Sequence, residues 1–69
     1  MDDDELAERL VAAEEKMGEA YELLAAVRDT LKAAGRKKDF LALNDVLDRL
    51  GRHGRMLGEM RESWGAPRD

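Results

Sequence analysis

Apolar residues recur every seven positions through the first half of the chain, and this repeat restricts the fold more than any other feature of the sequence. Leu10, Met17, Leu24 and Leu31 form one row of the repeat. The complementary row consists of Leu6, Ala13, Ala20, Val27 and Ala34. Alternating spacings of three and four residues are typical of a coiled-coil seam. The pattern predicts a first helix over about residues 3–34, with these two rows as its seam.

A second amphipathic segment follows a short polar stretch. Gly35 fits the left-handed position that ends many helices, and Asp39 fits an N-cap. We therefore expect a turn at 35–39, a second helix at about 40–64 and a tail at 65–69. The second helix repeats the same spacing with Leu43, Val46, Leu50, His53, Leu57, Met60 and Trp64, and Phe40 and Leu47 broaden its stripe. Because a short turn makes the helices antiparallel neighbours, the expected fold is an all-α two-helix hairpin.

Three glycines in the second helix leave two interpretations open. Gly51, Gly54 and Gly58 lie beside the leucines. Each glycine costs about 1 kcal/mol relative to alanine inside a helix. They indicate either close approach of another backbone or a bend or break in this region.

The small size of the chain favours self-association. It has 69 residues and no cysteine, so no disulfide can support the fold. A core of this size rarely contributes more than about 3–5 kcal/mol. Two hairpins that paired through their apolar stripes would form an antiparallel four-helix bundle. We expect a homodimer whose interface contains the larger residues of both stripes: Leu10, Met17, Leu24, Leu31, Leu43, Leu50 and Leu57.

Charge is distributed unevenly within a net charge of −4. Glu8, Glu15, Glu22 and Asp29 share one heptad row on the first helix, pointing away from the seam. We call these four residues the acidic row. It is either a solvated face that maintains solubility or a docking surface for a basic protein. In the second case Glu8, Glu15 and Glu22 are the candidate partner-binding residues, together with Trp64, because tryptophan is enriched at interface hot spots.

Basic residues concentrate at the turn. Arg36, Lys37 and Lys38 are consecutive there and are the candidate contacts for nucleic acid. The arginines of the second helix alternate with acids, and no aromatic platform accompanies them. The pairs Asp45–Arg49 and Asp48–Arg52 have the four-residue spacing of intrahelical ion pairs. Direct nucleic-acid binding is therefore the weaker expectation.

The sequence contains little that indicates a catalytic site or a metal site. His53 is the only histidine, and it lacks the convergent partners that a catalytic base or a metal site requires. We expect no enzyme activity, no metal and no cofactor. The acidic start of the chain differs from a secretory signal, and no apolar run approaches the length of a membrane span. A cytoplasmic protein without a membrane partner is expected.

One segment carries a resemblance to a known family. Lys38-Asp39-Phe40-Leu41-Ala42-Leu43, continued by Leu50 and Leu57, resembles helical hairpins of phage terminase small subunits. The resemblance implies a phage-encoded protein whose second helix supports oligomerisation, and it does not include that family's helix-turn-helix part. The overall layout is similar to the Rop-type hairpin, which dimerises into a four-helix bundle and binds RNA.

Together these observations predict a small non-enzymatic interaction or adaptor protein that associates with itself and docks on a protein partner. Two alternatives remain: a nucleic-acid-binding hairpin that uses the basic turn, and a phage-type inhibitor that presents its acidic row to a host protein.

Overall fold

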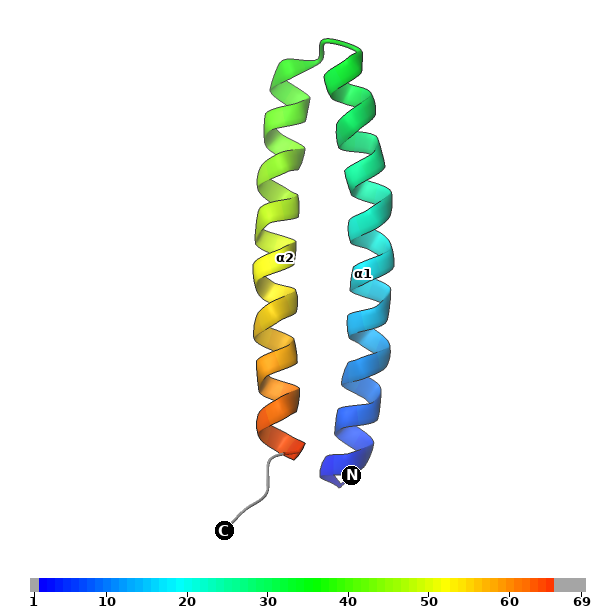
Figure 1. Ribbon diagram of the computed structural model, residues 1–69, viewed down its shortest axis with the longest axis vertical. Coiled ribbons are helices and arrows are strands. Elements are labelled where there is room, and N and C mark those ends of the chain that lie inside the picture. Colours follow the sequence, from blue (N-terminus) through cyan, green and yellow to red (C-terminus); the bar gives the residue numbers. More distant parts are fainter. Residues whose placement is uncertain (1, 66–69) are drawn as a thin grey trace.

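Two long antiparallel helices make up the part of the chain that the computed structural model describes, residues 2–65. Helix α1 is Asp3–Ala33 and helix α2 is Lys37–Gly65. They lie side by side along their whole length, joined by a tight turn (Figure 1). Residues 2–65 contain no strand. The all-α hairpin that the sequence predicts is confirmed, whereas most of the expected tail lies outside the described residues.

Local signals fix both ends of α1. The Asp2 carboxylate accepts a hydrogen bond from the Glu5 N–H at 2.8 Å, and acidic residues occupy the first turn, where they complement the helix dipole. At the other end Gly35 has φ +73°, as expected for a left-handed terminator. The Arg36 N–H donates to the Leu31 carbonyl at 3.0 Å, and the Gly35 N–H donates to the Lys32 carbonyl at 3.1 Å. This pair of bonds is a Schellman motif, which satisfies carbonyls at the helix end.

Helix α2 begins at Lys37, earlier than the sequence pattern predicts. The Arg36 carbonyl already accepts the Phe40 N–H at 2.9 Å, so the chain enters the second helix directly from the Schellman turn. The prediction that Asp39 is the N-cap is therefore wrong. Asp39 lies in the first turn of α2, where its carboxylate forms an ion pair with Arg36.

Helix α2 is continuous through its glycines, so the predicted alternative of a break that gives a third short helix is wrong. Two of the three glycines face α1 closely. A Cβ at position 51 would lie 3.7 Å from Tyr21 Cε2, and one at position 58 would lie 3.4 Å from Glu14 Oε1. Both distances are ordinary van der Waals contacts that an alanine would tolerate, and a Cβ at Gly54 would meet nothing within 4 Å, so close packing does not require glycine at any of the three positions.

The core lies on rows that differ in part from the predicted seams. Leu47 is the only fully buried side chain of the described residues, at 1% exposure. Around it, half-buried residues follow heptad spacing on both helices. On α1 the half-buried residues at this spacing are Ala7, Leu10, Glu14, Met17, Leu24, Arg28 and Leu31; on α2 they are Phe40, Leu43, Leu50, Gly54, Leu57, Arg61 and Trp64. Ala25, Gly51 and Gly58 are half-buried beside these rows.

The leucine rows were therefore predicted correctly, but their complementary rows were not. Leu6, Ala13, Ala20, Val27 and Ala34 were expected in the seam of α1, and Val46, His53 and Met60 in the seam of α2; all eight are exposed. Each helix has turned so that the residues on the other side of its leucine row face the neighbouring helix. The consequence is that a second apolar strip on each helix remains in contact with solvent.

Candidate interaction surface

The two displaced strips form one exposed apolar face. It consists of Leu6, Ala13, Ala20 and Val27 on α1 and Val46, His53 and Met60 on α2, and we call it the apolar face. Its larger residues remain well exposed: Val27 at 50%, Val46 at 48% and Met60 at 47%. Apolar side chains that gather on one exposed face are typical of an interaction site.

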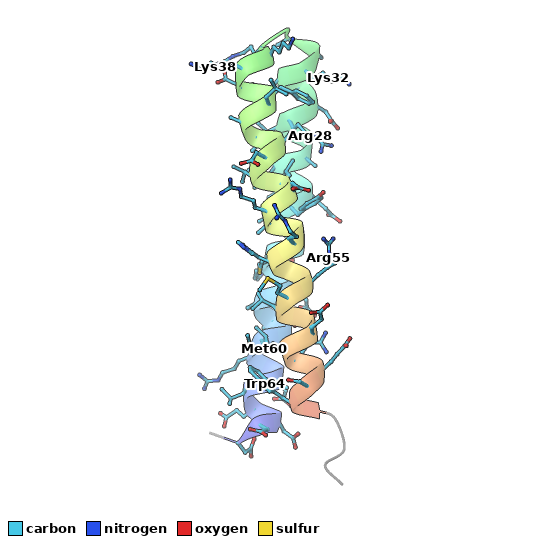
Figure 2. All side chains as sticks on the ribbon, turned by 90° about the vertical axis from the view of Figure 1, so that its left-hand side faces the viewer. Arg28, Lys32, Lys38, Arg55, Met60 and Trp64 are labelled. Carbon is cyan, nitrogen blue, oxygen red and sulfur yellow. The ribbon has the colours of Figure 1, made fainter. Side chains whose placement is uncertain are left out.

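Helix geometry places the two strips on the same side of the hairpin. Two antiparallel helices are related by an approximate two-fold axis normal to the plane that contains them. Equivalent heptad rows of the two helices therefore share a face. On each helix the apolar face takes the row that lies four positions before the leucine row. This row is residues 6, 13, 20 and 27 on α1 and residues 46, 53 and 60 on α2. In Figure 2, Met60 lies on one side of the hairpin, and Arg55 and Lys32 lie on the other.

A shallow apolar hollow lies on the α2 half of this face. His53, Met56, Leu57 and Met60 line this open hollow, whose volume is about 220 Å³. Met56 is 60% exposed, so two flexible thioether side chains border the hollow. Methionine adapts its shape readily to an apolar partner. This hollow can therefore receive an apolar side chain from another molecule.

A groove lined by glycines lies on the opposite face of the hairpin. Gly18, Gly51 and Gly54 line a groove of about 330 Å³ with Tyr21, and the groove also reaches Met17, Leu50, Glu14 and Arg55. A Cβ at Gly18 or Gly54 would meet nothing within 4 Å. The groove therefore arises from missing side chains between the helices, and it is distinct from the apolar face.

An interhelical ion pair borders this groove, and it was not predicted from the sequence. Arg61 Nε donates to Glu14 Oε2 at 2.6 Å, and a second guanidinium nitrogen donates to Oε1 at 3.4 Å. Both side chains are partly buried, at 34% and 21% exposure. The hydrogen bond and charge of Glu14 raise the pKa of Arg61 above its usual value. The pair fixes the axial register of the two helices, because a forked guanidinium–carboxylate contact is directional.

The predicted interface leucines lie between the two helices of one chain. Leu10, Met17, Leu24 and Leu31 of α1 and Leu43, Leu50 and Leu57 of α2 are all half-buried there. They form the boundary between the core and the apolar face. Covering that face would complete their burial.

The acidic row points away from the apolar face. Glu8, Glu15 and Glu22 are exposed and have no ion-pair partner within residues 2–65, whereas Asp29 accepts from Arg28 Nε at 3.2 Å. Trp64 is half-buried at the open end of the hairpin, where the ends of the two helices lie next to each other. The structure therefore separates the acidic candidates from the apolar ones.

The basic residues are largely paired on their own helices. Arg36 pairs with Asp39, and the two predicted intrahelical pairs are confirmed: Arg49–Asp45 and Arg52–Asp48, both at 3.1 Å. At the turn, Lys37 and Lys38 are exposed without an ion pair. The predicted nucleic-acid residues therefore provide two free cations at one end of the molecule.

His53 lies exposed on the apolar face. Between residues 2 and 65 no group of three or more histidine, aspartate or glutamate side chains converges as a metal site would require. In the same part of the chain neither helix is long and apolar enough to cross a membrane.

Comparison with known proteins leaves the apolar face as the main guide to function. No family model, no curated protein and no solved structure matches the chain.

Proposed function

We propose that this protein is a non-enzymatic interaction module that binds a second copy of itself through the apolar face, forming a four-helix bundle, and that presents its acidic row to a protein partner. The observation that carries the proposal is the continuous apolar face, which the fold of the single hairpin leaves uncovered. Covering it with an equivalent face would place the leucine rows of both copies in a common core.

The extent of exposed surface supports a second copy as the occupant. A compact monomer of 7.8 kDa exposes about 4,400 Å². This chain exposes 5551 Å², an excess of about 1,200 Å² over that expectation. A standard protein interface buries about 800 Å² on each partner. The elongated hairpin therefore exposes more surface than a compact monomer of its mass, and the excess is comparable to the area that one partner contributes to a standard interface.

The same arrangement leaves the acidic row free. Glu8, Glu15 and Glu22 lie on the side of α1 away from the apolar face, so they stay in solvent when two copies pair. A row of unpaired carboxylates attracts basic surfaces and speeds their association at low salt. A basic protein is the partner that fits this side of the bundle.

Thermal unfolding at several protein concentrations tests the proposed self-association. Association that accompanies folding makes the unfolding midpoint depend on concentration. We expect the midpoint, followed by circular dichroism, to fall by several degrees on dilution by about a hundredfold. A midpoint that stays the same over this range would show that the hairpin folds alone and would contradict the proposal.

A further inference from the structure

We infer that the two copies pair with their turns at opposite ends of the bundle, α1 against α1 and α2 against α2. This inference rests on the proposed self-association. Two hairpins that share one face can be related by a two-fold axis along the bundle, which places both turns at the same end. Alternatively, the axis runs across the bundle and places the turns at opposite ends. The distribution of charge and of side-chain size distinguishes these arrangements.

Charge differs strongly between the ends of the hairpin. The open end, residues 2–12 and 57–64, contains seven acids and two bases. The turn end, residues 28–45, contains five bases and three acids. Figure 1 shows that these segments lie at opposite ends of the molecule. One hairpin is thus negative at its open end and positive at its turn.

Only the arrangement with turns at opposite ends, the opposed arrangement, brings ends of opposite charge together. Packed helices lie about 8–10 Å apart. Salt screens charges with a length of about 8 Å at physiological ionic strength, so neighbouring ends still interact. Turns at the same end would bring two negative ends together. Turns at opposite ends bring each negative open end beside a positive turn, where Lys37 and Lys38 have no ion-pair partner of their own.

The row of α1 on the apolar face has its small residues at the centre. Ala13 and Ala20 lie between Leu6 and Val27. An axis that crosses α1 midway between the two alanines places Ala13 against the partner's Ala20, and Leu6 against the partner's Val27. Small residues at the crossing let the two α1 helices approach closely along the middle of the bundle.

The corresponding point on α2 falls within the apolar hollow. Tyr21 lies opposite Gly51 and Glu14 lies opposite Gly58, so the midpoint between Ala13 and Ala20 is level with residues 55–56. The hollow is bordered by residues 53–60, so the axis passes through it. A patch on a two-fold axis contacts its own copy and must be complementary to itself. Adjustable methionine side chains beside a hollow meet that requirement, because one copy's Met56 can fill the partner's hollow.

Distances between spin labels test the arrangement, and the absence of native cysteine makes single labelling straightforward. A label at Lys38→Cys lies at the exposed turn. With turns at opposite ends, each label lies about 17 residues along α2 from the axis at residues 55–56, so the two labels are separated by about 50 Å at a rise of 1.5 Å per residue. With turns at the same end, they lie within about 30 Å, a few helix diameters. Double electron–electron resonance distinguishes these distances.

A second label at Glu22→Cys distinguishes failure of the inferred arrangement from failure of the proposed self-association. This exposed position is near the middle of α1, so the labels lie within measurable range in either arrangement. A long distance at position 38, with a signal at position 22, is the expected result. A short distance at position 38 overturns the opposed arrangement and leaves self-association intact. No dipolar signal at either site overturns both this inference and the proposed function.

Discussion

Replacing Leu47 with aspartate is expected to unfold the chain. Leu47 is 1% exposed, the only fully buried side chain among residues 2–65. An uncompensated carboxylate in that position would cost more than about 4 kcal/mol. A core of this size supplies only about 3–5 kcal/mol, so we expect Leu47→Asp to lose its helical circular dichroism spectrum at 25 °C.

Leu41→Asp is the matched control, because it makes the same change on the same helix at a side chain that is 54% exposed. Surface substitutions usually alter stability by less than about 0.5 kcal/mol, so this variant should keep its helical spectrum and its unfolding midpoint within a few degrees. A Leu47→Asp variant that melts like the unmodified protein would show that the core is not centred on this residue.

If two copies pair as we propose, placing a charge on the apolar face is expected to separate them. Val27 is 50% exposed in the hairpin and becomes buried when the face is covered. Two-fold symmetry introduces the new carboxylate twice in each dimer. Burying two unpaired charges should raise the dissociation constant of Val27→Glu by at least about a hundredfold. Size-exclusion chromatography with light scattering would then report a monomer at concentrations where the unmodified chain is dimeric.

Val11→Glu provides the comparison for that experiment. Val11 lies on the same helix and is 38% exposed, but it follows the leucine row and so belongs to the side opposite the apolar face. Glutamate has a higher helix propensity than valine, so neither substitution weakens the helix itself. The Val11→Glu variant should keep the mass of the unmodified protein. Equal loss of the dimer in both variants would contradict the assignment of the interface to one face.

Features encoded locally in the sequence were predictable. The hairpin follows from the heptad spacing and from Gly35, whose positive φ and neighbouring hydrogen bonds produce the Schellman turn. The intrahelical pairs of Arg49 and Arg52 follow equally from spacing alone. Each of these features depends on residues a few positions apart, so the sequence pattern was sufficient.

The rotation of each helix about its own axis was not predictable in the same way. Apolar patterning assigned the strips of Val27 and Met60 to the seam, because their neighbours on the other side of the leucine rows include Glu14 and Arg61. In the structure these two long side chains lie between the helices and pair with each other. Charged residues with long aliphatic stems can cover apolar surface in this way. Nothing local to either helix indicates a pair that joins residues 47 positions apart.

The mass of the unmodified chain in solution tests the central claim most directly. Sedimentation equilibrium at micromolar concentration should give twice the chain mass of 7.8 kDa, with a helical circular dichroism spectrum in the same buffer. A stable, fully helical species with the mass of one chain at that concentration would show that a single hairpin tolerates its uncovered apolar face, and it would contradict the account.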